Sequence, residues 1–425
     1  MIIALTLILL ALIGTPLFII IAASALIGFY SAEIDLSVII IEFYRLAEMP
    51  ILLAIPLFTF AGYLLSESKA PLRLVRLTQA LLGWMPGGLA IVAICACALF
   101  TAFTGASGVT IVALGALLYP ALKQAGYHDN FNLGLITSAG SLGVLFAPSL
   151  PLILYGIVSQ QMGIGETFSI DDLFLAGILP GVLMILMLGG WSAWQGRTLP
   201  TTPFSWQELR AAVIDSKWEL PLPFIMLGGI YSGYFAVSEA AAVTAIYVLL
   251  VEVFILREIS LRALPSVMRE SMVLVGAILI ILGLSLASTN YLIDAQVPTK
   301  IFDTIREYIK DPLTFLLALN IFLLILGTML DIFSAIVIMT PILLPVALGY
   351  NIHPIHLGII FLANMQIGYF TPPVGMSLFI ASYRFKKPVA QLYRATLPFF
   401  FILLVALLII TYWPALSLTL VQAKQ

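Results

Sequence analysis

Long apolar runs dominate the chain, and several have the length that a helix needs to cross a bilayer. About twenty consecutive apolar residues span the hydrocarbon core as an α-helix. The pattern therefore predicts an all-α polytopic membrane protein, with one run, residues 219–257, long enough for two spans. The runs cover residues 2–30, 50–66, 172–194, 219–257, 271–292 and 395–420. We interpret the first run as a span rather than a cleaved signal peptide, because it lacks a basic leader and is long.

Composition agrees with this pattern. The 425 residues are 62% hydrophobic and 9% charged, with a mean hydropathy of +1.12, whereas soluble domains carry about 25% charged residues. The net charge of −2 gives no reason to expect a nucleic-acid partner. Cys95 and Cys97 lie two positions apart in an apolar helix, so they face different sides and predict neither a disulfide nor a metal site.

The distribution of basic residues predicts the orientation, because Lys and Arg near span ends concentrate on the cytoplasmic side. With Met1 in the cytoplasm, 14 of the 19 basic residues share that side, and loops 31–49 and 159–172 are external. The 14 are Lys69, Arg73, Arg76, Lys123, Arg197, Arg210, Lys217, Arg257, Arg262, Arg269, Arg384, Lys386, Lys387 and Arg394. This orientation requires residues 86–122 and 313–348 each to enter and leave on one face.

Both of those segments have the pattern of a re-entrant helical hairpin. Each contains two short apolar stretches joined by a polar, glycine-containing tip, FTGASG at 103–108 and GTMLDIFS at 327–334. Each follows an amphipathic stretch, 67–84 or 294–312, that is typical of a helix lying at the membrane interface. A pair of ordinary kinked spans is the alternative.

An internal repeat argues against kinked spans. A shift of 224 to 225 positions places LGLITSAGSLGVLFAPSLPLILY (133–155) on LGIIFLANMQIGYFTPPVGMSLF (357–379). The matches pair Pro148 with Pro372, Gly134 with Gly358, Ala139 with Ala363, Pro120 with Pro345, and the span 50–66 with 274–290. On the predicted orientation the two hairpins open to opposite sides. The chain is therefore predicted to be an inverted structural repeat, in which secondary transporters place substrate and ion sites near the bilayer midplane.

Two helices are predicted to break inside the membrane, at SAGSLGVLFAPS (138–149) and GYFTPPVGMS (368–377). Proline removes a backbone hydrogen bond and glycine permits unusual dihedrals. Unpaired backbone at membrane depth is tolerated only where it lines a cavity or is buried in protein. Freed carbonyl groups suit a small hard cation such as sodium, and exposed N–H groups suit a carboxylate. We expect each tip to face the break in its own half, giving two cation sites with an anion between the tips.

Asp331 is the most informative polar residue, because a carboxylate at bilayer depth costs about 2.5–3.5 kcal/mol unless it faces a cavity, a cation or a partner. Helix capping is its alternative role. Asn364 could serve a site or bond a neighbouring helix equally well. Glu239 and Glu252, near span ends, are more typical of structural residues.

At these residues the chain resembles the large membrane subunit of TRAP (tripartite ATP-independent periplasmic) transporters, essentially end to end. The second half carries GTMLDIFSAIVIMTPILLP (327–345), NMQIGYFTPPVGMSLF (364–379) and GGIYSGYFAVSEAAAV (228–243). The first half adds FTGASG, APS at 147–149 and LYG at 154–156. This chain has TGAS, APS and VSEA where the family commonly has SGS-type, PPS and PTEA sequences. The first departure leaves only backbone oxygen at Ala106 as a ligand.

The resemblance implies sodium-driven uptake of an organic acid anion, a carboxylate or a sulfonate, in the bacterial inner membrane. A periplasmic binding protein would deliver the anion, a small four-helix membrane subunit would assist, and an elevator-type movement would carry the anion across the bilayer. Two or more sodium ions would outweigh one carboxylate, and each charge gains about 2.3 kcal/mol per 100 mV. No GxxxxGK phosphate loop for ATP is present.

The resemblance also assigns candidate residues. The first sodium site would use Thr104, Ala106, Ser107, Ser141, Gly143 and Pro148. The second sodium site would use Gly327, Asp331, Asn364, Gly368, Thr371 and Pro373. The substrate would contact Thr104, Gly105, Ser107, Ser149, Ser334, Thr371 and Pro372.

The expected domains are alternating scaffold and transport segments. They are scaffold and first arm (1–85), first hairpin and broken helix (86–158), scaffold and second arm (159–312), second hairpin and broken helix (313–383), and a C-terminal helix (384–425). One alternative is a self-sufficient sodium-coupled anion symporter without a binding protein. A membrane-embedded enzyme is disfavoured, because the only histidines, His128, His353 and His356, lack HExxH spacing and fall in predicted loops or span ends.

Overall fold

The computed structural model describes residues 15–199, 201 and 203–424, and all regular elements in these ranges are helices. The part up to the middle of the chain contains α2 (Leu17–Ser31), α3 (Ser37–Ala47), η1 (Pro50–Leu53), α4 (Ala54–Glu67), α5 (Ala70–Leu82), α6 (Gly88–Thr104), α7 (Ser107–Gln124), α8 (Asp129–Ala139), η2 (Leu142–Leu145), α9 (Leu150–Gln161), α10 (Ile170–Gln195) and α11 (Trp206–Asp215). The remainder contains α12 (Pro221–Tyr231), α13 (Val237–Leu249), η3 (Leu250–Ile255), α14 (Leu264–Asp294), α15 (Val297–Tyr308), α16 (Pro312–Met329), α17 (Ile332–Gly349), α18 (Pro354–Gly368), α19 (Met376–Phe385), α20 (Val389–Tyr412) and α21 (Ala415–Gln422).

Seven of the described helices are long and apolar enough to cross a bilayer, or eight if the bent pair 129–145 and 150–161 forms one span. The prediction of a multi-pass, all-α protein is confirmed. Residues 219–257 contain one helix of spanning length, Val237–Ile255, while α12 has 11 residues and is too short for a second crossing. The last run ends its helix at Tyr412, because Pro414 follows. Residues 2–14 of the first predicted span lie outside the described ranges.

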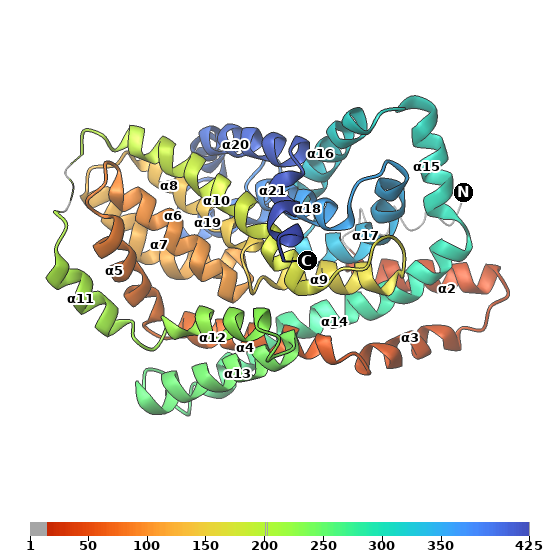
Figure 1. Cartoon of the computed structure of the whole chain (residues 1–425), viewed down its shortest axis with the longest axis horizontal. Coiled ribbons are helices and arrows are strands. Elements are labelled where there is room, and N and C mark those ends of the chain that lie inside the picture. Colours follow the sequence, from red (N-terminus) through yellow and green to blue (C-terminus); the bar gives the residue numbers. More distant parts are fainter. Residues whose placement is uncertain (1–14, 200, 202, 425) are drawn as a thin grey trace.

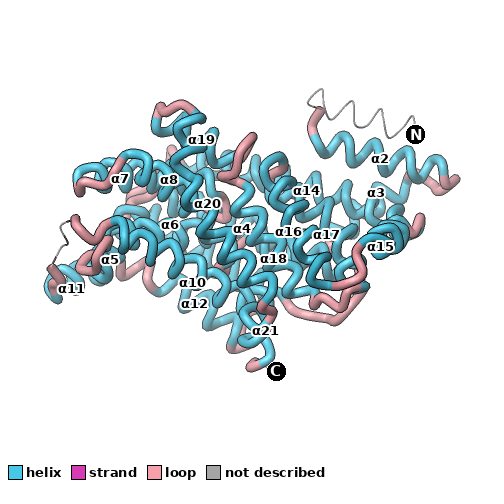
Figure 2. Tube along the Cα trace, turned by 90° about the horizontal axis from the view of Figure 1, so that it is seen from above, coloured by secondary structure: helices cyan, strands magenta, loops and turns pink. Residues whose placement is uncertain are grey.

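The helices form two packed groups (Figure 1). In one group, α4 packs against α13 and α14, and α14 also packs against α2 and α3; these helices lie along the lower side of Figure 1. In the other group, the main hydrophobic core joins α6 to α10 with α16 to α20, and it continues onto α4, α13 and α14 of the first group. The helices α5 and α15, which correspond to the two predicted interfacial stretches, lie at opposite ends of the molecule in Figures 1 and 2. We call the first group the scaffold layer and the second the hairpin body.

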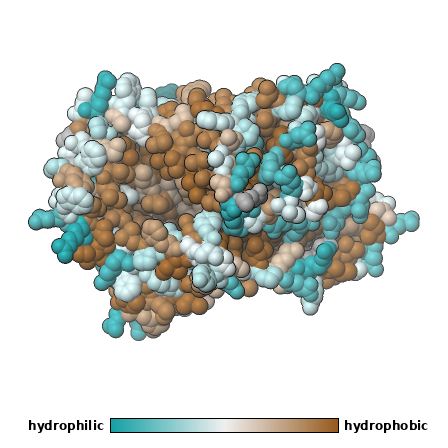
Figure 3. Space-filling model, in the orientation of Figure 1, coloured by the Kyte–Doolittle hydropathy of each residue, from teal (hydrophilic) through white to brown (hydrophobic). Residues whose placement is uncertain are grey.

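The surface agrees with immersion in lipid. Figure 3 shows apolar side chains over much of the middle of one face, with hydrophilic ones gathered toward its margins. Large apolar side chains on different helices are exposed, among them Leu186, Ile325 and Phe401. In water such surface would be costly, so it is the surface expected of a protein solvated by acyl chains.

Both predicted hairpins are helix pairs with short tips. In the first, α6 has 17 residues and α7 has 18, separated by two residues. In the second, α16 and α17 have 18 residues each and are also separated by two. The arms are longer than the roughly 15 residues expected from the apolar stretches. The two helices of each pair are nevertheless joined by only two residues.

The helix that follows each break packs on the hairpin of the other half. The helix α9, which follows the first break, packs against α17, and α19, which follows the second break, packs against α7. These contacts lie far apart in the sequence, so they depend on both halves being folded.

A buried charge cluster fixes α5 to the scaffold layer. Arg73 Nε donates to Glu219 Oε1 at 2.5 Å, and Arg73 Nη1 donates to Glu258 Oε1 at 2.6 Å. A third carboxylate, that of Glu252, lies 3.6 Å from Arg73 Nη2 with its side chain 1% exposed. Although burial acts in the opposite direction, hydrogen bonds from Arg73 and from the Lys69 backbone lower the pKa of Glu258. The Arg73 guanidinium therefore lies within 4 Å of three carboxylates.

Candidate functional site

The first hairpin tip is built around a glycine in the left-handed region. Gly105 ends α6 with φ of +66°, a conformation that side chains rarely adopt. Ala106 is then extended and begins α7 as its N-cap. A Cβ atom on Gly62 of α4 would lie 2.5 Å from the Phe103 carbonyl oxygen, so the scaffold backbone comes very close to this tip. The tip is thereby held against the scaffold layer.

In the second tip, a charged residue caps the helix that follows. Asp331 is the N-cap of α17, where its Oδ2 accepts from the Ser334 N–H at 2.9 Å and its Oδ1 accepts from the Ser334 hydroxyl at 2.5 Å. Asp331 occupies the position 225 residues after Ala106, the N-cap of α7. The capping role considered from the sequence is therefore present, and it leaves the carboxylate half-buried at the tip.

Both helix breaks lie where the sequence places them. The first interrupts the chain between Ala139 and Leu150, with a 3₁₀ turn at η2, and the second lies between Gly368 and Met376. The peptide bonds before Pro148 and Pro373 are cis. Asn364, expected to belong to the second break, instead lies within α18, one turn before the break begins.

The two breaks contact each other directly. The Ser141 hydroxyl donates to the Gln366 carbonyl at 3.1 Å, and these residues are 225 positions apart. Within the breaks, therefore, structurally facing residues follow a shift of 225, which pairs Pro148 with Pro373 rather than with Pro372.

One glycine at each break allows the break to approach a hairpin closely. A Cβ on Gly143 would lie 2.4 Å from the Ala102 nitrogen, and a Cβ on Gly368 would lie 2.6 Å from the Gly327 Cα. Gly368 lies 225 positions after Gly143, and Gly327 lies 225 positions after Ala102. In each case the neighbour is helix backbone, which cannot move aside as a side chain can. Each break therefore seats against the first helix of its own hairpin.

A cavity of about 370 Å³ lies where the tips meet. Residues of the first tip (Gly105, Ala106, Ser107) and of the second (Asp331, Ile332, Phe333) line it, together with Val144, Tyr369 and Met376 from the breaks. Scaffold residues on α4 and α14 form its other wall, namely Tyr63, Leu274, Ala277, Ile278 and Ile281. Among the described residues that line the cavity, Asp331 is the only Asp, Glu, Lys or Arg. The N-termini of α7, α17 and α19 all reach this cavity.

Each hairpin also bonds the break of its own half. The Thr101 hydroxyl donates to the Gly140 carbonyl at 2.8 Å and lies 2.6 Å from the Thr110 hydroxyl. In the second half, the Ile332 N–H donates to the Tyr369 hydroxyl at 2.5 Å. A third link crosses between halves, because Ser377 Oγ lies 3.4 Å from Ser107 Oγ.

The remaining candidate residues are distributed unevenly. Thr104, Ser149 and Ser334 are buried beside the tips and breaks but do not line the cavity. Thr371 turns its hydroxyl back to the Ile367 carbonyl at 2.7 Å. Pro372 and Pro373 are exposed, and the Pro373 carbonyl accepts from the Tyr393 hydroxyl at 2.5 Å. The prolines therefore shape the break, while the polar atoms gather away from them.

Several buried polar atoms next to the breaks have no hydrogen-bond partner among the described residues. They are Thr104 Oγ1, Ser149 Oγ, Asn364 Oδ1 and Gln366 Oε1. Buried polar atoms are normally satisfied, because an unmade hydrogen bond costs about 1–3 kcal/mol. Oxygen atoms in this situation are candidates for binding a cation or a substrate group.

Sequence reasoning missed Thr101, Thr110, Tyr369, Ser377 and Asn320, all buried and bonded around the site. Asn320 had a readable signal, since an amide in an apolar helix is costly without a partner. The threonines gave no such signal, because a threonine hydroxyl can donate to a backbone carbonyl of its own helix.

The histidines do not form a catalytic group. His353 caps α18 and pairs with Glu166 at 3.0 Å. His356 lies in the first turn of α18, as expected for a span end, and is buried, with ring nitrogens 3.1 Å from the Ser417 hydroxyl and from the Thr411 carbonyl.

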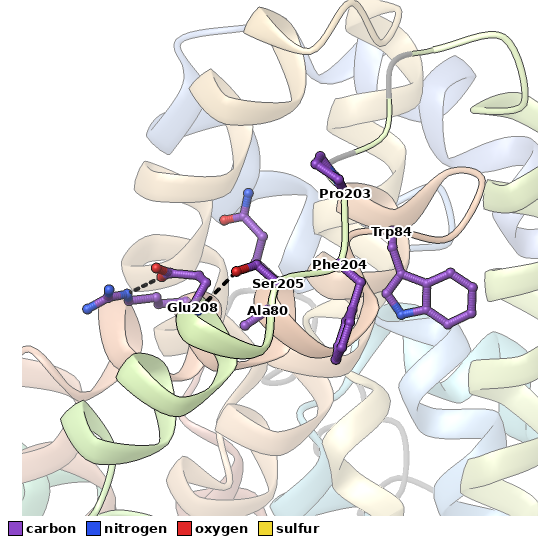
Figure 4. Close-up of a pocket in the computed structure, with 8 residues that line it drawn as sticks. Ala80, Trp84, Pro203, Phe204, Ser205 and Glu208 are labelled. Carbon is purple, nitrogen blue, oxygen red and sulfur yellow. Dashed lines mark hydrogen bonds and ion pairs between the residues drawn. The ribbon is translucent and has the colours of Figure 1, made fainter.

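A second cavity of about 240 Å³ lies between α5 and the start of α11 (Figure 4). Trp84 and Phe204 lie on one side of it, and Ser205 accepts from the Glu208 N–H at 3.3 Å. The Arg76 guanidinium, which lines this cavity, is already paired with Glu208 at 2.7 Å and with Asp215. Because the charged groups that line this cavity are already paired, we interpret it as part of the contact between α5 and α11 rather than as a transport site.

Comparison with known proteins gives one consistent family. Residues 2–416 match the family model described as tripartite ATP-independent periplasmic transporter, DctM component. The C4-dicarboxylate TRAP transporter large permease protein DctM of Pseudomonas aeruginosa is 38% identical over 89% of this chain and 88% of its own length. The isethionate TRAP transporter permease protein DctMQ of Oleidesulfovibrio alaskensis is 36% identical over 89% of this chain and 59% of its own length.

Among solved structures, the YdaH transporter of Alcanivorax borkumensis has a similar fold. Its TM-score is 0.61, with 13% sequence identity over 89% of this chain and 87% of that one. The relatives are named as transporter permeases, in agreement with the prediction that the chain is not an enzyme.

Proposed function

This chain belongs to the DctM component family of tripartite ATP-independent periplasmic transporters, and on that premise we propose that it takes up a small organic acid anion together with sodium. The relatives are named for C4-dicarboxylate and isethionate, a carboxylate and a sulfonate. An anion of one of these two classes is therefore the proposed substrate.

The cavity between the tips is the observation that carries this proposal. Three helix N-termini reach it, and the positive ends of their dipoles favour a negative ligand. Asp331 opposes them, because a carboxylate repels an anion in a medium of low dielectric constant. A cation bound nearby would remove this conflict, so co-transport of sodium and anion satisfies both features.

The sodium sites are proposed on the oxygen atoms beside each tip. In the first half, the Thr101 and Thr110 hydroxyls and the Gly140 carbonyl lie together, and the tip and break beside them also carry the Ser141 hydroxyl and the unpaired Thr104 hydroxyl. In the second half, Asp331 and the unpaired Asn364 oxygen belong to the segments that meet at Gly327 and Gly368. Hard cations prefer such oxygen ligands.

The inverted repeat and the re-entrant hairpins remain part of this proposal. In support, the contacts of Gly143 with Ala102 and of Gly368 with Gly327 follow one shift, and Ser141 meets its counterpart Gln366. The reciprocal packing of α9 on α17 and α19 on α7 is the pattern that a two-fold axis between the halves would produce. The N-terminus is proposed to be cytoplasmic, from the distribution of basic residues.

An elevator movement is proposed along the wall formed by α4 and α14. The hairpin and break segments, 86–158 and 313–383, would move together, while 1–85 and much of 159–312 would stay fixed. The helices α10 and α20 pack with the hairpin body and would move with it. The small membrane subunit would bind the scaffold layer, and a periplasmic binding protein would deliver the anion.

Sodium dependence is the direct test. The chain would be reconstituted in proteoliposomes with its small membrane subunit and binding protein, and uptake of C4-dicarboxylates and isethionate would be measured. Replacing external sodium by choline at constant ionic strength should lower uptake to about a tenth or less, because the gradient drives transport. Uptake that ignores sodium would contradict the proposed coupling, and equal uptake without the binding protein would identify a self-sufficient symporter.

The charge of Asp331 is tested by Asp331→Asn. Asparagine keeps the N-cap oxygen but removes the negative charge, so protein yield should be close to wild type. Uptake at low sodium should fall roughly tenfold, the effect of losing about 1.4 kcal/mol of cation binding. Wild-type sodium dependence in this variant would remove Asp331 from the mechanism. Ser334→Ala, which removes the hydroxyl that donates to Asp331 Oδ1, is the matched control for the cap.

A further inference from the structure

Asn364 is held by a chain of buried hydrogen bonds that runs away from the cavity. Its Nδ2 donates to Asn320 Oδ1 on α16 at 2.6 Å and to the Ile360 carbonyl at 2.8 Å. Asn320 Nδ2 in turn donates to the Thr411 hydroxyl on α20 at 3.0 Å. Asn320, Asn364 and Thr411 are at most 2% exposed. Three helices therefore converge on one amide.

These contacts fix which end of each amide points where. A backbone carbonyl can only accept, so the nitrogen of Asn364 must face Ile360. Asn320 must then present its oxygen to Asn364 and its nitrogen to Thr411. The Asn364 oxygen is directed elsewhere and has no partner among the described residues. An amide oxygen that is buried, oriented and unpaired is a preorganised cation ligand.

The same pair of helices forms the close glycine contact. Gly327 lies two turns after Asn320 on α16, and Gly368 lies one turn after Asn364 on α18. The Asn320–Asn364 bond therefore fixes the rotation of α18 against α16 immediately before the second break. Any change in that rotation would also move the carbonyl groups that the break exposes.

We propose that Asn320 is a positioning residue for the second cation site, holding Asn364 so that its oxygen is available to the ion. This inference rests on the proposed sodium-coupled function and names a residue that the sequence did not single out. Asn320 does not touch the ion itself. Thr411 acts one step further out, by keeping the Asn320 amide in register.

The experiment compares Asn320→Leu with Asn320→Asp. Leucine is similar in size but cannot accept a hydrogen bond from Asn364. The Asn364 amide can then turn, and its oxygen loses its fixed direction. Aspartate keeps an oxygen in the same place and serves as the conservative rescue. The full chain is purified in detergent, and its melting temperature is followed as sodium replaces choline. Uptake with the partner subunits is measured across the same sodium range.

The sodium concentration for half-maximal stabilisation is expected to rise roughly tenfold in Asn320→Leu and to stay near wild type in Asn320→Asp. The half-saturating substrate concentration at high sodium should change little. Asn132→Leu is the matched control, because Asn132 is an equally buried amide on α8 that bonds the Tyr127 carbonyl. An unchanged sodium midpoint in Asn320→Leu, with wild type still responding to sodium, would overturn the positioning role. A wild type that does not respond to sodium would instead overturn the proposed function.

Discussion

Replacing Gly368 by alanine is expected to abolish measurable uptake. The new methyl group would lie 2.6 Å from the Gly327 Cα and carbonyl carbon, far inside normal contact distance. Backbone of a packed helix must then shift, and overpacking of this kind costs about 1–3 kcal/mol or more. A displacement near 1 Å at positioned groups lowers turnover by roughly a hundredfold. Uptake in proteoliposomes measures the effect, and Gly143→Ala should behave alike because it meets the Ala102 nitrogen at 2.4 Å.

Gly190→Ala is the matched control for this substitution. Gly190 lies within α10, and a Cβ there meets no atom of the described residues within 4 Å. It should transport as wild type, because alanine favours the helix and touches nothing. Normal uptake by both Gly368→Ala and Gly143→Ala would show that the close approach of break and hairpin is not required.

Replacing Arg73 by methionine is expected to destabilise the protein by about 3–5 kcal/mol, the cost of leaving buried charge without its partner. Glu219 and Glu258 would each lose a short hydrogen bond, and Glu252 would lose its nearest positive charge. The loss would be measured as a lower melting temperature and a lower yield of folded protein after solubilisation. Adding Glu219→Gln and Glu258→Gln to the same chain should restore part of the stability.

Arg76→Met is the control for charge in general. Arg76 lies one turn further along α5 and also pairs with two carboxylates, but its side chain is 43% exposed and those of its partners about half exposed. Exposed pairs contribute about 0–1 kcal/mol. If Arg73→Met were no less stable than Arg76→Met, the buried cluster would not be the anchor of α5.

Much of the fold could be predicted from the sequence, because lipid imposes strict rules on length and polarity. The apolar runs predicted α4, α10 and α14 to within a few residues at most ends. Glycine and proline predicted both helix breaks, since each changes backbone geometry by itself. The repeat stays a prediction, and the contact of Ser141 with Gln366 is consistent with a shift of 225 positions.

The site was less predictable, because its polar atoms are brought together by packing between distant segments. Nothing local indicates that Ser141 meets Gln366 or that Asn320 meets Asn364. The proline carbonyls looked suitable as ligands from their position in the break, yet Pro372 and Pro373 are exposed. Their rigid rings set the direction of the chain, while flexible hydroxyl and amide groups nearby carry the unpaired oxygens.

The exchange of α9 and α19 between the halves has a consequence for how this molecule is built. Each half supplies a helix that packs on the hairpin of the other, so each one alone would leave part of its hairpin uncovered. The two halves therefore pack as one body rather than as two domains in series. A substitution on α9 or α19 changes the surface that the hairpin of the other half packs against.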